Sequence, residues 1–290
     1  MKKRQTIAIV GPGKLGTALA QALHGAGYRI AEIVARDGSR TFAAARSFAR
    51  KLGAQYSPLS AANLEADVIW ICVPDDAIAS ISLQLARRKD WRGKIVLHSS
   101  GALSSEELRP LKQRGAATGS AHPMMTFANH APVEWKGIPF AIEGDAAAVN
   151  FARDVARKLK LDAFTISARS KPLYHAVGSF ASPIFVGLLS VAERVARAAG
   201  VSKPPREIMG RILQRTVAHY LKGGTAAAFS GPMQRGDLAT VRRHLENLRR
   251  VPGALEIYSL LAMELASNLP VKRRAELKRL LKATNSPRRK

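Results

Sequence analysis

The sequence predicts an α/β half followed by an all-helical half, and two observations carry this prediction. From residue 6 to about residue 166, short apolar runs alternate with helix-length segments, which is the pattern of parallel strands joined by crossover helices. After residue 167 no run resembles a strand, and the apolar residues recur with helical spacing. We therefore predict a sheet domain over residues 1–168, a helical domain over 169–283 and a frayed tail over 284–290.

The apolar runs of the first half define the expected sheet. Parallel strands buried on both faces read as continuous apolar stretches, and helices must cover both sides of such an open, doubly wound sheet. The expected strands are residues 7–10, 30–34, 68–73, 95–98, 116–119, 139–142 and 164–166. The expected helices between them include residues 39–52, 78–88, 104–114 and 145–159.

The turn after the first strand carries three glycines in the stretch VGPGKLGTAL. Gly11 would allow the sharp turn, Gly13 would let the backbone approach a pyrophosphate, and Gly16 would let the helix pack closely on the strand. The first turn of that helix, with Lys14 and Leu15, would offer its amides and its positive dipole end to phosphates. We interpret the motif as a dinucleotide site, and a turn without a ligand is the alternative.

The other common phosphate-binding loop does not fit this stretch. It would require glycine at position 8 and serine or threonine at position 15, where the chain has Ala8 and Leu15. The glycine motif therefore favours a dinucleotide over a nucleoside triphosphate.

The end of the second expected strand, in EIVARDGSR, indicates which dinucleotide is preferred. An acidic residue there typically holds the ribose hydroxyls of NAD, whereas an arginine accommodates the 2′-phosphate of NADP. Arg36, Ser39 and Arg40 form a cationic, hydroxyl-rich segment, so NADP is favoured over NAD. Asp37 argues for NAD, because a small rotation would place its carboxylate where the arginine should be.

Two further segments are expected at the carboxyl edge of the sheet, where ligands bind in open α/β folds. The stretch CVPDDAI ends one strand, and its Val73 and Pro74 would turn the chain across the dinucleotide. The stretch HSSGAL follows the next strand, which places Ser99 and Ser100 near the nicotinamide.

The long helix that begins the second half has two distinct faces. Its apolar residues step by three or four positions, as the core-facing side of a helix would, and Pro183 is expected to kink it. On the opposite side Lys171 and His175 lie one turn apart, placed to share a proton or hold a carboxylate; a solvated helix face is the alternative. The apolar stripe comprises Leu173, Val177, Phe180, Ile184, Leu188, Val191 and Val195, and the polar stripe continues through Ser179 and Ser182.

Three more residues are candidates for substrate binding. His122, in SAHPMMTF, follows an expected strand and is held extended by the next proline; a satisfied core histidine is the alternative. Arg235, in the loop FSGPMQRGD, could clamp a substrate carboxylate, with Asp237 beside it. Alternatively, Asp237 caps the next helix and Arg235 is solvated.

Composition argues against several other functions. With Cys72 as the single cysteine, neither a disulfide framework nor a metal site is expected. No run reaches about 18 uninterrupted apolar residues and no cleavage site follows the start, so we expect no membrane span and a cytoplasmic protein. The net charge of +25 invites a nucleic-acid role, but the charges are dispersed and no aromatics interleave the dense run at 272–290. A basic surface that attracts acidic ligands is favoured instead.

Taken together, these motifs give the chain a family resemblance. In order they are VGPGKLGTAL, VPDDAI, HSSGAL, HPMMTF, KPLYHAVGSFAS and GPMQRGD, and they span nearly the whole sequence. The chain resembles the Rossmann-like oxidoreductases whose helical C-terminal domain was long filed as a domain of unknown function. That group lies within the wider 6-phosphogluconate-dehydrogenase-like superfamily.

The resemblance implies an NADP-preferring reductase that dimerises through its helical domain, with a substrate such as ketopantoate. In the related ketopantoate reductases and β-hydroxyacid dehydrogenases, a lysine that starts the first helix after the sheet domain acts on the substrate oxygen, which corresponds to Lys171. Those β-hydroxyacid enzymes place an asparagine four residues later, where this chain has His175. The expected substrate is a small carboxylate-bearing carbonyl or imine. A non-catalytic dinucleotide-binding regulator and a basic nucleic-acid binder are the competing hypotheses.

Overall fold

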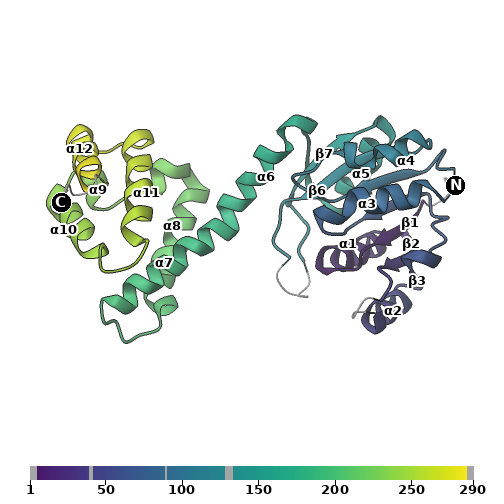
Figure 1. Ribbon diagram of the computed structural model, residues 1–290, viewed down its shortest axis with the longest axis horizontal. Coiled ribbons are helices and arrows are strands. Elements are labelled where there is room, and N and C mark those ends of the chain that lie inside the picture. Colours follow the sequence, from purple (N-terminus) through teal and green to yellow (C-terminus); the bar gives the residue numbers. More distant parts are fainter. Residues whose placement is uncertain (1–4, 39–41, 89, 128–132, 286–290) are drawn as a thin grey trace. The chain divides into compact units, whose positions relative to one another are not determined.

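Two compact units, Met1–Ser182 and Pro183–Lys290, make up the chain in a computed structural model that describes residues 5–38, 42–88, 90–127 and 133–285 (Figure 1). We call them the sheet unit and the helical unit. The sequence places the domain boundary at residue 168, whereas helix α6 (Lys171–Ser179) groups with the sheet unit. The predicted candidates Lys171 and His175 therefore lie in the same unit as the glycine turn.

The sheet unit contains one eight-stranded sheet with the order β3-β2-β1-β4-β5-β6-β7-β8. All neighbouring strands are parallel except β6 and β7, so the predicted doubly wound α/β class is confirmed. The chain runs outward from β1 to β3 and then returns to β4, which makes the crevice between β1 and β4 the expected ligand position. The strands are β1 (Thr6–Val10), β2 (Arg29–Ala35), β3 (Gln55–Pro58), β4 (Val68–Ile71), β5 (Ile95–His98), β6 (Ala117–Pro123), β7 (Pro139–Gly144) and β8 (Asp162–Thr165).

Helices cover both faces of this sheet. Alternate residues of β1 point to opposite sides, where Ile7 and Ile9 join the core under α1 and α5, and Ala8 and Val10 join the core under α3 and α4. Burial of each large apolar side chain contributes about 1.5–3 kcal/mol to stability, so these two cores hold the helices against the sheet. The helices are α1 (Lys14–Gly25), α2 (Phe42–Lys51), α3 (Asp75–Ala86), α4 (Arg109–Gln113) and α5 (Ala146–Leu159).

The helical unit has a small core built from its last three long helices. Val241 and Leu245 pack with Ala262, Leu277 and Leu281. The predicted all-helical class of the second half is confirmed, with a break in α8 where Gly223 and Gly224 depart from helical geometry. The helices are α7 (Phe185–Ala198), α8 (Pro205–Ala228), α9 (Pro232–Arg235), α10 (Leu238–Leu248), α11 (Ala254–Asn268) and α12 (Arg274–Asn285).

The apolar stripe of the first long helix differs from the sequence prediction. The helix is interrupted by a π-helical turn at Phe180–Ile184 that contains Pro183, in keeping with the expected kink. The stripe does not face a core, because Leu173 is 78% exposed and Phe180 is 68% exposed. By length and composition the segment Ala168–Ala198 is apolar enough to cross a membrane, and its most apolar window is entirely unburied. Its spacing indicates an apolar face, and in the part of the chain that the structure describes its first residues remain uncovered.

Candidate functional site

The glycine turn between β1 and α1 is shaped by close backbone contacts. Gly11 has a φ of +95°, its N–H donates to the Val34 carbonyl at 2.8 Å, and a Cβ there would lie 2.7 Å from the Cys72 carbonyl oxygen. A Cβ on Gly16 would lie 2.1 Å from the carbonyl oxygen of Gly11. Gly13 is exposed, and a Cβ there would meet open space. Only glycine therefore fits positions 11 and 16, at the crevice between β1 and β4.

The start of helix α1 is suited to an anion. Gly13 is its N-cap and provides no side-chain cap, and the first turn, which contains Lys14 and Leu15, has no acidic residue. The positive end of the helix dipole is therefore not neutralised by a carboxylate of this turn. Val73 lies beside the turn, since its Cγ1 would be 2.7 Å from a Cβ on Gly11, and Pro74 is the N-cap of α3.

The segment after β2 places two opposite charges next to each other. Arg36 and Asp37 are both exposed directly after the last residue of β2. Asp37 is bound by Ser60, whose N–H donates to Oδ2 at 3.1 Å and whose hydroxyl donates to Oδ1. Ser39 and Arg40, the other predicted cofactor residues of this segment, lie outside the described residues.

The loop after β5 is held by its own polar side chains. Ser99 accepts a hydrogen bond from Trp70 Nε1 at 2.9 Å, and the Ser100 hydroxyl donates to Asp75 Oδ2 at 2.8 Å. Both serines are buried and their hydroxyls help to fix the loop, while their predicted position near the nicotinamide stays a prediction. His98 Nδ1 accepts from the Ser100 N–H at 3.1 Å, which leaves Nε2 to donate to the Ser104 carbonyl at 3.0 Å. His98 is therefore a neutral imidazole with both nitrogens satisfied.

Lys171, the first residue of α6, is fully buried against this loop. Its Nζ donates to the Ser100 carbonyl at 2.9 Å and to Ser120 Oγ, on β6, at 2.7 Å. The Ser120 hydroxyl in turn donates to the Ser100 carbonyl at 3.1 Å. Lys171 thus joins α6 to the ends of two adjacent strands, β5 and β6.

Two histidines and a tyrosine surround this lysine. The rings of His122 and His175 lie with centroids 5.9 Å apart, and His122 Nδ1 is 3.2 Å from the Tyr174 hydroxyl. A Cβ on Gly101 would lie 2.6 Å from His175 Cδ2 and 2.8 Å from His122 Nε2. The absence of a side chain at Gly101 is therefore what lets the two imidazoles approach the loop after β5. The lysine–histidine cluster comprises Lys171, Tyr174, His175, His122, His98, Ser100 and Ser120.

Burial sets the protonation states of this cluster. It lowers the pKa of His98 and of His122 to about 4, in both cases with a smaller contribution from the Lys171 charge, so both rings are neutral near pH 7. Burial also lowers the pKa of Lys171 to about 8, although the nearby carboxylates of Glu143 and Asp75 oppose the shift. Lys171 can therefore lose and regain its proton close to neutral pH. His175 is the exposed ionisable member of the cluster.

The other predicted substrate-binding residues are Ser179 in the sheet unit and Arg235 and Asp237 in the helical unit. The Ser179 hydroxyl donates to the His175 carbonyl at 3.4 Å, inside helix α6. In the helical unit, Asp237 accepts from the Thr240 N–H at 3.0 Å and caps α10, while Arg235 is exposed at the end of α9. The cap matches the simpler interpretation of Asp237. Substrate roles for these residues stay predictions.

Three members of the cluster were not singled out from the sequence. Ser120 and His98 lie inside strands, where a polar residue in an apolar run is a signal of a buried partner. Tyr174 is adjacent to His175, and it lies outside the four-residue spacing that connects Lys171 with His175. Among the residues that the structure describes, no group of three His, Cys, Asp or Glu side chains is placed to hold a metal ion.

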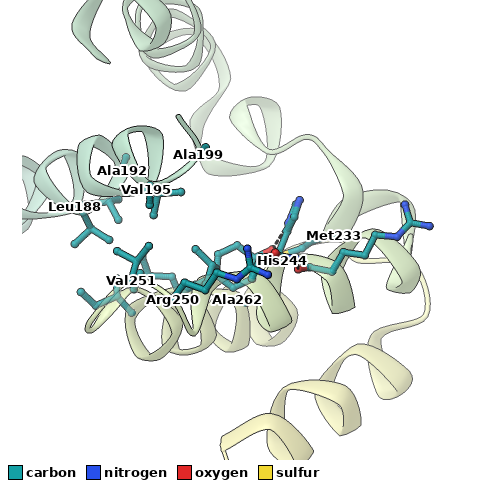
Figure 2. A pocket seen from close by; sticks show the side chains of 18 of the residues that line it. Leu188, Ala192, Val195, Ala199, Met233, His244, Arg250, Val251 and Ala262 are labelled. Atoms are coloured by element: carbon teal, nitrogen blue, oxygen red, sulfur yellow. Dashed lines mark hydrogen bonds between the residues drawn. The ribbon is translucent and has the colours of Figure 1, made fainter. Parts of the chain in front are cut away.

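The helical unit has a cavity of its own, of about 760 Å³. Leu188, Ala192 and Val195 of α7 line one side, and residues of α10 and α11 line the other (Figure 2). The lining is mostly apolar, and it includes an exposed polar pair in which His244 Nδ1 lies 2.9 Å from the Tyr258 hydroxyl. Apolar residues of α7 therefore line this cavity together with helices α10 and α11, which belong to the small core.

Comparison with known families gives two matches, and the second begins inside the sheet unit. Residues 1–123 match the model of a Rossmann-like domain, and residues 138–265 match the model of a domain of unknown function, DUF2520. The chain thus combines these two domains, in agreement with the resemblance noted in the sequence. A comparison with curated proteins gives no match.

Solved structures with the same fold cover nearly the whole chain. A candidate NADP oxidoreductase from Bacteroides fragilis is 24% identical, with a TM-score of 0.74 over 90% of this chain and 97% of that one. A reductive aminase from Aspergillus terreus in complex with NADPH and ethyl levulinate is 19% identical, with a TM-score of 0.65 over 96% and 99% of the two chains. An imine reductase from Myxococcus stipitatus in complex with NADP+ is 20% identical, with a TM-score of 0.60 over 96% and 94%. At these identities the likeness establishes the fold.

Proposed function

We propose that the protein is an NADPH-dependent reductase of a small carbonyl or imine that bears a carboxylate. The observation that carries the proposal is the coincidence, in one unit, of a glycine turn that excludes side chains and a buried lysine–histidine cluster at the same carboxyl edge of the sheet. The cofactors named for the structural neighbours from Aspergillus terreus and Myxococcus stipitatus support the choice of NADP.

The residues at the β1–α1 turn fit a dinucleotide. A Cβ would fill the space beside Gly11 and Gly16, so the glycines keep a backbone cradle open at the uncapped start of α1. Arg36, exposed at the end of β2, is positioned for the 2′-phosphate that distinguishes NADP from NAD. Val73 and Pro74, beside the turn, would contact the same molecule. Bound there, the nicotinamide supplies the hydride.

Proton delivery is assigned to the Lys171–His175 pair. His175 is exposed, so a substrate can reach its imidazole, and the ring is held against Gly101 and His122. Lys171, one helical turn earlier, is buried with a pKa of about 8, so it can exchange a proton near neutral pH while its hydrogen bonds to Ser100 and Ser120 hold the loop. Neutral His122 adds a polar wall without a competing charge. The reduced oxygen or nitrogen of the substrate would receive its proton from this side.

The acting group follows from the same chemistry. A carbonyl oxygen and an imine nitrogen both gain one hydride and one proton, so the cluster can serve either. The names of the reductive aminase and the imine reductase favour the imine as the first class to assay. A panel of 2-oxo acids, ketopantoate among them, and cyclic imines, followed by loss of NADPH absorbance, tests the assignment.

One variant and its control separate chemistry from binding when turnover and the Kd for NADPH are both measured. Lys171→Met, which fills the buried space without a proton, should lower turnover at least about 100-fold and leave the Kd for NADPH within about threefold. Ser80→Ala, on the exposed face of α3, is the control that should change neither. An active Lys171→Met variant would remove the lysine from the mechanism. NADPH binding without turnover of any substrate in the panel would support the competing hypothesis of a non-catalytic regulator.

We further propose that two copies associate through α6, α7 and α8. Leu173 of α6, in the sheet unit, is 78% exposed, and Ile212 and Leu221 of α8, in the helical unit, are 66% and 77% exposed. Exposed large apolar side chains of this kind favour association with a partner. A second copy would cover these side chains symmetrically. The apolar cavity beside α7 adds to the surface that a partner could bury.

A further inference from the structure

The two charged residues after β2 carry conflicting signals about the dinucleotide. A carboxylate at this position accepts the two ribose hydroxyls of NAD, and it repels the 2′-phosphate of NADP. Asp37 is adjacent to Arg36 and equally exposed, so its position in the sequence alone would allow either preference. What the carboxylate contacts decides which residue is available.

Asp37 is held by a residue from the neighbouring strand. Strand β3 pairs with β2 in parallel, with Ala35 opposite Pro58, so the segments after the two strands lie side by side. Both carboxylate oxygens of Asp37 accept hydrogen bonds from Ser60, one from its N–H and one from its hydroxyl. These bonds lower the pKa of Asp37, with Ser60 as the main cause, so the carboxylate is charged and each of its oxygens has one donor from Ser60.

A second residue fixes the segment that carries Ser60. The guanidinium of Arg88, just after α3, donates to the carbonyl of Leu59 at 2.6 Å, of Ser60 at 3.1 Å and of Ala62 at 3.3 Å. Three bonds from one planar group to three carbonyls hold residues 59–62 as a rigid turn. The turn cannot follow Asp37 if the carboxylate swings toward a ribose, because its backbone is tied to Arg88.

We infer that Ser60 determines coenzyme specificity by holding Asp37 away from the ribose and leaving Arg36 to receive the 2′-phosphate. The inference rests on the proposed dinucleotide site and goes beyond it, because it assigns the preference to a serine that itself touches no ligand. Ser60 is therefore a positioning residue, and Arg88 supports it. The chain therefore contains the carboxylate that would select NAD, but Ser60 holds this carboxylate away from the ribose.

Four proteins test this inference: the wild type, Ser60→Ala, Asp37→Ala and the double variant. The measurement is the ratio of the Kd for NADH to the Kd for NADPH, obtained by titration of each full-length protein. In the wild type NADPH should bind more tightly, and Asp37→Ala should change the ratio less than about threefold, since the carboxylate is already withheld. Ser60→Ala removes the hydroxyl donor to Oδ1 and keeps the N–H donor to Oδ2. It should lower the ratio about tenfold, because a hydrogen bond to a charged acceptor is lost and the less restrained carboxylate can turn toward the ribose. The double variant should return to the wild-type ratio.

The Kd ratio of the double variant distinguishes the proposed role of Ser60 from a merely structural one. Damage to the turn would weaken both nucleotides alike and would persist when Asp37 is also removed. Ser80→Ala is the control for loss of an exposed serine hydroxyl. An unchanged ratio in Ser60→Ala, or a shift that persists in the double variant, would overturn the inference while leaving the dinucleotide site intact. Absence of binding of either nucleotide to the wild type would overturn the proposed function as well.

Discussion

At the scale of single residues, the most informative group is Lys171. A lysine is rarely fully buried, and this one donates to the Ser100 carbonyl and the Ser120 hydroxyl rather than to a carboxylate. Such burial costs stability because the ammonium loses its hydration, and it brings the pKa down to about 8. A stabilising role alone would be met better by an apolar side chain, which supports the proton role that we propose for Lys171.

Gly101 controls how closely the histidines approach the loop. Gly101→Ala should displace the His175 and His122 rings, because the new Cβ would lie within 3 Å of both. We expect turnover to fall about 10- to 100-fold with little change in the Kd for NADPH, since a shift of about 1 Å misplaces the proton donor. Gly178→Ala on α6, where a Cβ would be 3.8 Å from Met124, is the matched control. Full activity of Gly101→Ala would argue against a role for the two imidazoles.

The neutral histidines give the protein a defined pH dependence. His98 and His122 have folded-state pKa values of about 4, below the unfolded value of about 6.5, so the unfolded chain binds more protons between these values. The free energy of unfolding should therefore fall as the pH drops from 6.5 to 4, by up to about 1.4 kcal/mol per pH unit for each histidine. His98→Asn, which cannot titrate, should flatten this slope in denaturant titrations. An unchanged slope would contradict the burial of a neutral His98.

At the scale of elements, the β1–α1 turn is the part that the sequence predicted best. Glycine is the one residue whose absence of a side chain can be read directly, and the spacing of Gly11 and Gly16 matches the close contacts found. Strand β3 was missed, because Gln55–Pro58 is short, polar and at the sheet edge. Its pairing with β2 brings Ser60 to Asp37, so that contact could not be predicted either.

The two glycines of α1 differ in what a side chain would meet. Gly16→Ala would place a Cβ 2.1 Å from the Gly11 carbonyl oxygen and push the helix away from the turn. We expect a loss of stability of about 1–3 kcal/mol and at least about tenfold weaker NADPH binding, as the amides of the first helical turn move. Gly25→Ala, at the other end of the same helix with open space around it, should leave both unchanged. Equal NADPH affinities in the two variants would separate the ligand from this turn.

The apolar stripe of α6 and α7 marks the limit of prediction from periodicity. The spacing of Leu173, Val177 and Phe180 establishes that one side of the helix is apolar, but the same spacing results whether that side faces the chain's own core or a partner. The sequence prediction of a core was wrong for the single chain, since these side chains are exposed.

At the scale of the whole molecule, the contacts of the cluster explain what sequence reasoning could and could not find. Lys171 and His175 were identified because they lie on one helix face. The partners of Lys171 are Ser120, on β6, and Ser100, in the loop after β5; they are 51 and 71 residues away from it and only the fold brings them together. The net charge of +25 would attract the phosphorylated coenzyme and the acidic substrate that we propose.

Self-association is the first whole-molecule prediction. Light scattering after size-exclusion chromatography should give a dimer at micromolar concentration, and the double variant Ile212→Glu, Leu221→Glu should be a folded monomer because both side chains are exposed in the single chain. Gln214→Glu, on the same helix, is the control that should remain dimeric. A monomeric wild type, or one that instead partitions into lipid vesicles, would contradict the dimer.

The most direct measurement of the central claim is a calorimetric titration of the wild-type protein with NADPH and with NADH. The account predicts one NADPH per chain, bound at least about tenfold more tightly than NADH, with the difference removed by Arg36→Ala because the 2′-phosphate then loses its guanidinium. If neither nucleotide binds saturably, or if NADH binds as tightly as NADPH, the assignment of the crevice between β1 and β4 to NADP is contradicted.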